Sequence, residues 1–109
     1  MTTVADIMKE AFDAAQSASK QMYDKIGGDG YACGFAWVEV HKVRRNSKLG
    51  KELLAYGFKP SYRSGQLDLW NPGGLNVQNI DIKEEGAIAF AKILREKLGI
   101  SAYAGSRLD

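Results

Sequence analysis

The chain has 109 residues, of which 45% are hydrophobic and 26% are charged, and its formal net charge is +2. This length is enough for one compact core, so we expect a single α+β domain over residues 1–109 and exclude two ordinary domains. Cys33 is the only cysteine, which excludes a disulfide within one chain and a zinc or iron–sulfur site built from several cysteines.

The amino-terminal segment indicates where the protein acts. Residues 1–26 mix acids and bases with apolar residues and lack the apolar core of a signal peptide. No later stretch approaches the run of roughly 18 apolar residues that a membrane helix requires. We therefore expect a cytoplasmic protein that has no membrane partner.

The first predicted element is an amphipathic helix over residues 4–26. Apolar residues recur along it at helical spacing, and Thr3 with Asp6 has the spacing of a capping box. Gly27 begins a glycine-rich segment that is typical of a helix end.

Residues 33–43 are rich in aromatic and β-branched side chains and predict a strand with two different faces. One face carries an apolar row that we assign to the core, namely Ala36, Val38 and Val40. The other face carries a mixed row, namely Phe35, Trp37, Glu39 and His41. This mixed row packs under a helix, lines a groove or meets a partner subunit, and the sequence leaves these alternatives open.

A second, shorter helix is predicted from a cap at Asn46 or Ser47 to a glycine at position 57. The alternation of residues 66–70 then predicts a half-buried strand. After a strong turn, residues 75–80 are predicted to return as the hairpin partner of that strand.

Asp81 and Glu84 have capping-box spacing, and they begin a third predicted helix that stops at Gly99. Residues 100–105 alternate as a last strand, which leaves residues 106–109 as a terminal tail. The predicted order is α-β-α-β-β-α-β, with three helices packed on a small mixed or antiparallel sheet of three to four strands.

Positive charge is concentrated between His41 and Gln66. This segment has seven basic side chains and one acid, Glu52, whereas the other 83 residues have 8 basic and 12 acidic side chains. The basic residues are Lys42, Arg44, Arg45, Lys48, Lys51, Lys59 and Arg63. Such a cluster is typical of a surface that meets a phosphate, a nucleotide or a nucleic-acid backbone.

The start of the second predicted helix is the first candidate site. Arg44, Arg45 and Lys48 surround the Asn46-Ser47 cap, although a cation near a helix amino terminus costs roughly 0.3 to 1 kcal/mol unless an anion neutralises it. We therefore expect these residues, with Arg63, to bind a phosphate-like anion. The alternative is a solvated surface helix whose bases balance acidic helices elsewhere.

Two further candidates lie later in the chain. Trp70 suits stacking on a flat base, and Gln78 and Asn79 suit contacts with the edge of that base. The alternative for these three residues is ordinary turn chemistry and a packed indole. Arg107 suits a forked contact with a phosphate, and its alternative is an exposed ion pair in a frayed tail.

Catalytic groups are poorly placed along the chain. Cys33 and His41 lie on the same face of one predicted strand but roughly 26 Å apart, which excludes a Cys-His pair. Asp81, Glu84 and Glu85 fall in the first turn of a helix, where carboxylates have a stabilising role. We therefore expect no enzyme, no metal site and no cofactor.

Several short segments carry a resemblance to known proteins. They are residues 34–38 (GFAWV), 46–51 (NSKLGK), 70–71 (WN), Gln78 and 106–109 (SRLD). On these segments the chain resembles small bacteriophage accessory proteins, most of which have no assigned activity. It is similar in kind to the phage cyclic-nucleotide sponges that counter Thoeris defence, which combine aromatic, amide and arginine contacts at subunit interfaces. The resemblance implies that Trp70, Asn79 and Arg107 are compatible ligand positions.

These observations lead to one hypothesis and two alternatives. The hypothesis is a non-enzymatic, homo-oligomeric phage protein that acts in the cytoplasm of the infected host cell. It sequesters a phosphorylated nucleotide-like ligand through Arg44, Arg45 and Lys48, while Trp70 stacks on the base. The first alternative is a protein-interaction module that inhibits a host protein or serves as a structural accessory of the phage. The second is direct DNA or RNA binding through the basic segment, residues 42–63.

Overall fold

Seven elements follow one another in the predicted order, α-β-α-β-β-α-β, in the computed structural model, which describes residues 2–109. They are α1 (Val4–Ile26), β1 (Gly34–His41), α2 (Lys48–Ala55), β2 (Lys59–Pro60), β3 (Gln66–Trp70), α3 (Ile80–Leu98) and β4 (Ser101–Leu108). The predicted α+β class is thereby confirmed. None of the helices in residues 2–109 is both long and apolar enough to cross a bilayer.

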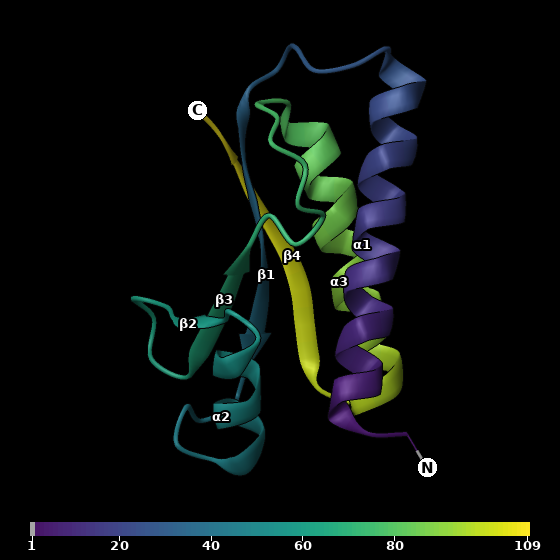
Figure 1. Cartoon of the computed structure of the whole chain (residues 1–109). Helices are drawn as coiled ribbons and strands as arrows, with labels where there is room; N and C mark the ends of the chain where they lie inside the picture. Colours follow the sequence, from purple (N-terminus) through teal and green to yellow (C-terminus); the bar gives the residue numbers. More distant parts are fainter. Residues whose placement is uncertain (1) are drawn as a thin grey trace.

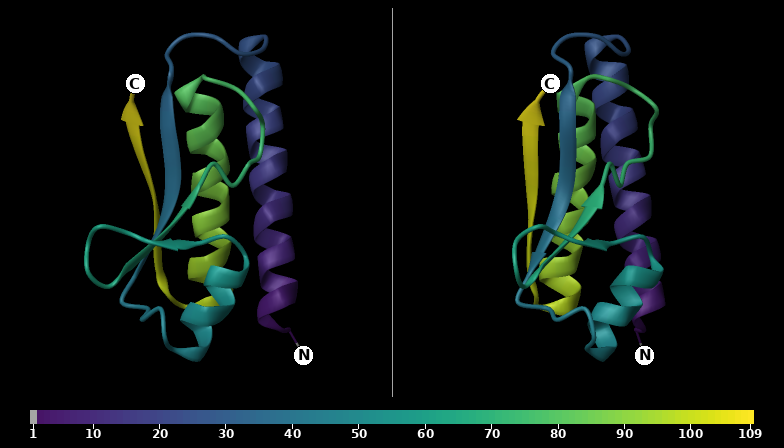
Figure 2. Two further views of the ribbon diagram at one scale, coloured as in Figure 1. Left: turned by 60° about the vertical axis from the view of Figure 1, so that its left-hand side comes forward. Right: turned by 90° about the vertical axis from the view of Figure 1, so that its left-hand side faces the viewer.

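The four strands form one antiparallel sheet in the spatial order β2-β3-β1-β4. Helix α3 lies against one face of this sheet, where it contacts β1 and β4, and α1 packs on α3 on the same side of the sheet. The opposite face carries no helix among residues 2–109 (Figures 1 and 2). The short helix α2 lies at the lower end of the molecule in Figure 1. We call the side of the sheet under α1 and α3 the covered face and the other side the open face.

Local sequence explains where the helices begin and end. The hydroxyl of Thr3 accepts the N–H of Asp6, whose carboxylate accepts the N–H of Thr3, so the predicted capping box is confirmed. Gly27 ends α1 in the left-handed conformation, with φ at 81°. The side-chain oxygens of Ser47 and Asn79 cap α2 and α3.

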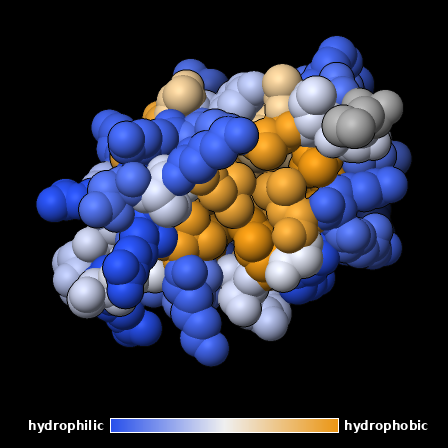
Figure 3. Space-filling view, turned by 90° about the horizontal axis from the view of Figure 1, so that it is seen from below, coloured by the Kyte–Doolittle hydropathy of each residue, from blue (hydrophilic) through white to orange (hydrophobic). Residues whose placement is uncertain are grey.

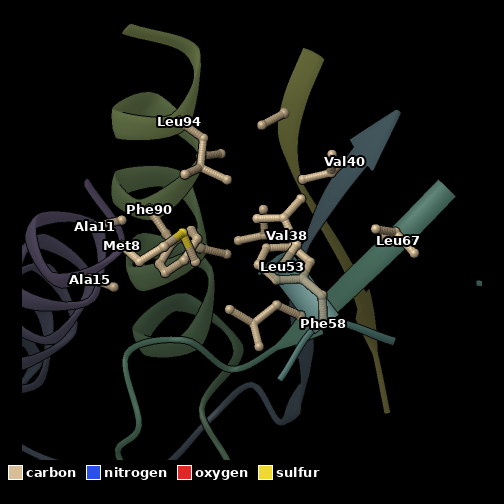
Figure 4. Packing of buried hydrophobic residues seen from close by; sticks show 14 of the residues in the cluster. Met8, Ala11, Ala15, Val38, Val40, Leu53, Phe58, Leu67, Phe90 and Leu94 are labelled. Carbon is tan, nitrogen blue, oxygen red and sulfur yellow. The ribbon is translucent and has the colours of Figure 1, made fainter. Parts of the chain in front are cut away.

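The core lies between the covered face and the two long helices. Val38 and Val40 of β1 and Phe90 of α3 have no solvent exposure. In Figure 4, Phe90 points from α3 toward Val38 and Phe58, and Phe12 meets Phe90 edge to face with ring centroids 4.9 Å apart. Burial of one large apolar side chain stabilises a fold by roughly 1.5 to 3 kcal/mol, so this layer holds most of the stability.

Apolar side chains also reach the surface at the lower end of the molecule. Figure 3 shows an apolar patch between α2 and the start of α1. The half-buried hydrophobic residues of the elements that meet at this end are Val4, Val43, Leu49, Leu54, Leu98 and Ile100. The buried residues of α2 are Gly50 and Leu53, so this helix is held by fewer core contacts than α1 or α3.

The predicted hairpin partner over residues 75–80 is wrong. The N–H groups of Gln78 and Asn79 donate to the carboxylate of Asp29 instead of forming a ladder with β3. The edge strand beside β3 is β2, whose two residues pair with Asp68 and Leu67. A strand that contains a proline is compatible with a sheet edge, although the sequence pattern did not indicate it.

Two predicted element ends also differ from the structure. Helix α3 begins at Ile80 with Asn79 as its cap, because the side-chain oxygen of Asn79 accepts the N–H of Ile82. The predicted cap, Asp81, instead lies in the first turn of the helix. Strand β4 continues to Leu108, so Arg107 pairs with Phe35 of β1 and does not lie in a free tail.

Candidate functional site

The open face of the sheet is rich in aromatic and charged side chains. Strand β1 presents its mixed row on this face, and every member of the row is only partly buried. The mixed row therefore does not pack under a helix. The neighbouring strands extend the surface with Gln66, Asp68 and Trp70 from β3, and with Tyr103 and Arg107 from β4.

Two indoles form the centre of the open face. Trp37 and Trp70 are cross-strand partners whose ring centroids lie 4.8 Å apart, with 31° between the ring planes. Trp70 remains 50% exposed. Gly105 of β4 lies opposite Trp37, and a Cβ at this position would lie 2.5 Å from the indole nitrogen. The missing side chain therefore makes the space in which the Trp37 indole lies.

Arginines bring positive charge to this surface from two directions. Arg107 is the β4 partner of Phe35, and its guanidinium carbon lies 5.3 Å from the centre of that ring. Arg63, which follows β2, donates a hydrogen bond of 3.1 Å to the Tyr62 hydroxyl. This contact with Tyr62, and then two nearby carboxylates, raise the pKa of Arg63 above its ordinary value. A guanidinium is charged at any ordinary pH.

Those two carboxylates lie on the floor of the surface. Glu39 and Asp68 are direct cross-strand partners. The amide nitrogen of Gln66 donates to Glu39 at 3.3 Å and to Asp68 at 2.8 Å, and the Trp37 indole donates to Glu39 at 3.2 Å. Like charges that lie directly opposite one another destabilise a sheet, and the bridging amide offsets part of this repulsion. The second carboxylate oxygen of Glu39 lies 3.5 Å from Nε2 of His41. Carboxylate oxygens are acceptors, so both groups can accept N–H groups of a ligand.

Together these side chains line a groove of about 350 Å³. Its aromatic members are Trp37, Trp70 and Tyr62, and its cations are Arg63 and Arg107. We call it the aromatic groove. It combines an exposed π surface with cations and carboxylate acceptors, which suits a flat anionic ligand that carries N–H donors.

A second hollow, of about 580 Å³, adjoins the aromatic groove. Arg44, Arg45 and Asn46 line it, together with Arg63 and Gln66, which also line the aromatic groove. We call it the basic hollow. Its lining brings together three of the arginines that the sequence singled out as anion ligands, from two segments of the chain.

A tight turn sets the position of Arg44 and Arg45. The Ser47 hydroxyl accepts the N–H of Gly50 at 3.0 Å and donates to the carbonyl oxygen of Arg44 at 2.6 Å. A Cβ at Gly50 would collide with the same carbonyl group. The cap and the glycine therefore fix the backbone from which the two arginines extend.

Four of the predicted site residues do not line either hollow. Ser47 acts as the cap of α2, and Lys48 is the exposed first residue of that helix. Gln78 is exposed beside Cys33, with its side-chain oxygen 3.5 Å from the sulfur. Asn79 is fully buried, where its oxygen caps α3 and its amide donates to the carbonyls of residues 30 and 31. We therefore leave these four residues out of the proposed site.

Five residues that line the aromatic groove were not predicted as ligands, namely Trp37, Glu39, Tyr62, Gln66 and Asp68. Trp37 and Glu39 belong to the mixed row, for which a groove was one of the alternatives left open. The alternation within Gln66–Trp70 puts Asp68 on the same face as Trp70, which is the only sequence signal for it. The position of Tyr62 depends on the connection between β2 and β3, which the sequence did not indicate. Within residues 2–109, no group of three or more His, Cys, Asp or Glu side chains is placed to hold a metal ion.

The fold and the groove define a two-layer α+β protein whose open sheet face joins aromatic rings to arginines. Comparison of the chain with models of known protein families, with curated protein sequences and with solved structures gives no match in any of the three. The geometry of the open face is therefore the guide to function.

Proposed function

We propose that the protein binds a phosphorylated nucleotide in the aromatic groove, with its base stacked on Trp70 and its phosphate held by arginines. The observation that carries this proposal is the position of a half-exposed indole in the same groove as Arg63 and Arg107. A nucleotide unites in one molecule the flat ring, the N–H donors and the phosphate that these groups would contact.

The surroundings of Trp70 support a stacking role. Stacking of a base on an aromatic side chain contributes about 1 to 3 kcal/mol. Trp70 has Trp37 at 4.8 Å and Phe35 at 5.9 Å between ring centroids, so its ring has little rotational freedom left to lose on binding. An exposed indole that is already held by its neighbours favours binding over simple core packing.

The carboxylates on the floor support a defined orientation of the ligand. Glu39 and Asp68 repel a phosphate but accept N–H and amino groups, which lie on the edges of bases. A nucleotide is therefore favoured with its base over the floor and its phosphate toward Arg63 and the basic hollow. The role that we propose is retention of the ligand, without a reaction.

Isothermal titration calorimetry tests the proposal with a panel of linear and cyclic nucleotides and the matching nucleosides, at ligand concentrations up to the millimolar range. We expect nucleotides to bind at least tenfold more tightly than nucleosides, because only nucleotides carry the phosphate. We expect Trp70→Ala to weaken binding by at least tenfold, since this variant lacks the stacking surface.

Tyr103→Ala is the matched control, because Tyr103 is an exposed aromatic residue of the same face, at 52% exposure, that does not line the groove. We expect this variant to bind like the wild type. The proposal is wrong if the folded protein binds no nucleotide, or if Trp70→Ala and Tyr103→Ala have equal effects.

A further inference from the structure

The aromatic groove and the basic hollow are neighbours, and we treat them together as one track. They share Arg63 and Gln66, and the basic hollow begins where β1 ends. On β1 the partner of Arg107 is Phe35, and the β3 partner of His41 is Gln66. Because a strand rises about 3.3 Å per residue, these two levels of the sheet are roughly 20 Å apart.

Chemical groups alternate along this track in a definite order. Arg107 lies at one end, and the paired indoles of Trp37 and Trp70 follow. The carboxylates of Glu39 and Asp68 come next on the floor, and Arg63 leads to Arg44 and Arg45 at the other end. A single nucleotide has one phosphate group beside its base, so it does not reach cations at both ends of such a track. A chain of nucleotides carries phosphates on both sides of every internal base.

The open face also encloses a bound molecule less than pockets for small ligands usually do. Pockets for small molecules usually bury 70% or more of the ligand surface. No helix of residues 2–109 covers the face (Figure 2). Tyr62 and Arg63 at its border are themselves exposed. Proteins that bind single strands instead combine an open aromatic surface with a charged groove that follows the backbone.

We propose that the ligand of this track is a single-stranded nucleic acid, of which one base stacks on Trp70. Its flanking phosphates contact Arg107 on one side and Arg63, Arg44 and Arg45 on the other. This inference rests on the proposed function and specifies its ligand class. A duplex is disfavoured, because its bases are stacked inside the helix and do not reach the indole.

Fluorescence anisotropy with end-labelled oligoribonucleotides of one mixed sequence, in lengths of two, four and eight, measures the effect of chain length. Unlabelled mononucleotide and unlabelled oligomers compete in the same assay. We expect the tetranucleotide to bind at least tenfold more tightly than the mononucleotide, and the same sequence in a duplex to bind at least tenfold more weakly than the single strand. The slope of log affinity against log salt should grow by about 0.7 for each additional contacted phosphate.

The double variant Arg44→Ala/Arg45→Ala locates the distal phosphates. We expect this variant to bind the tetranucleotide at least fivefold more weakly than the wild type. The slope of log affinity against log salt should fall by about 1.4, while the affinity for the mononucleotide stays within twofold. Lys92→Ala/Lys97→Ala removes two exposed cations from α3 and is the matched control. Circular dichroism and thermal unfolding establish that each variant is folded.

The possible results separate the two proposals. The single-strand inference is overturned if the mononucleotide binds and the tetranucleotide binds no more tightly. It is also overturned if Arg44→Ala/Arg45→Ala causes no selective loss of tetranucleotide affinity. In both cases the proposed function stands. If oligonucleotides bind but Trp70→Ala has no effect, binding is by charge alone and stacking on Trp70 is excluded. If neither mononucleotides nor oligonucleotides bind, both proposals fail.

Discussion

The two faces of β1 use the same eight residues of backbone for different purposes. On the covered face, Val38 and Val40 are fully buried under α1 and α3. On the open face, Phe35 and Trp37 remain partly exposed although they are larger and would contribute more to a core. The small, β-branched residues of the covered face therefore contribute mainly to stability, whereas the largest rings of β1 lie where a ligand can reach them.

The largest effect is expected from breaking the covered layer at Phe90. We expect Phe90→Ala to lower the free energy of unfolding by about 3 to 5 kcal/mol, because a fully buried ring leaves a cavity. Urea denaturation measures this loss. The milder Phe90→Leu should keep the protein folded and leave nucleotide affinity within twofold, and a large loss of affinity would contradict the separation of the two faces.

A smaller effect, on both stability and binding, is expected from Gly105→Ala. The added methyl group would displace the Trp37 indole, which supports Trp70. We expect a loss of about 1 to 3 kcal/mol in unfolding free energy, and an affinity several-fold weaker although no ligand-contacting group is removed. Leu108→Ala, on the same strand and 68% exposed, is the control and should change neither quantity. Unchanged affinity in Gly105→Ala would show that the position of Trp37 does not affect ligand binding.

Asp29 lies in the loop before β1 and accepts hydrogen bonds from the residues just before α3. It therefore joins these two segments at one end of the covered layer. Hydrogen bonds from the N–H of Gln78, and then from those of Asn79 and Gly30, lower the pKa of Asp29. The pKa of an aspartate is about 3.9 in the unfolded chain. Because the pKa of Asp29 is lower in the folded protein, its carboxylate stabilises the fold at pH values above about 3.9. This contribution disappears as the pH falls through the pKa of the folded protein.

We therefore expect Asp29→Asn to unfold more easily than the wild type at pH 7, with a difference that shrinks below about pH 4. Thermal unfolding between pH 2 and 8 measures this. Asp24→Asn, which removes the same charge from an exposed helical ion pair, is the control and should differ little from the wild type at any pH. A constant difference across the pH range would exclude the proposed role of the carboxylate.

The smallest effect is expected from Asp68→Asn on the open face. Its amide oxygen can still accept the Gln66 hydrogen bond, and the repulsion between two opposed carboxylates is removed. We expect the unfolding free energy at pH 7 to stay the same or rise by up to about 0.5 kcal/mol in a chemical denaturation experiment. A loss above about 1 kcal/mol would show that the carboxylate pair stabilises the sheet.

Local patterns were sufficient to predict much of the fold. The Thr3 capping box, the glycine at the end of α1 and the alternation of β1 all depend on neighbouring residues, and the structure confirms them. The missed strand β2 has only two residues, and one is a proline. Residues 75–80 were predicted as a strand because their pattern did not reveal a partner from another part of the chain. That partner is Asp29, about fifty positions away, whose carboxylate accepts the N–H groups of Gln78 and Asn79.

The candidate site was predictable in its residue types but not in its arrangement. The charge cluster indicated Arg44, Arg45 and Arg63, and these three residues line one hollow. Asn79 has the same chemistry as a ligand residue, but it is buried as a helix cap, which only the tertiary structure shows. The pairing of Trp37 with Trp70 joins two strands and depends on the sheet register, which no local pattern of residues indicates.

The position of the indoles has a practical consequence for spectroscopy. The chain has two tryptophans, and they are the pair in the aromatic groove, at a centroid distance of 4.8 Å. Intrinsic tryptophan emission therefore reports on the open face, whereas the packed interior contains phenylalanine as its aromatic residue and stays silent at the same wavelengths. Coupling between two rings so close should also give a paired near-ultraviolet signal, so the protein carries a native optical probe at the place where we expect the ligand.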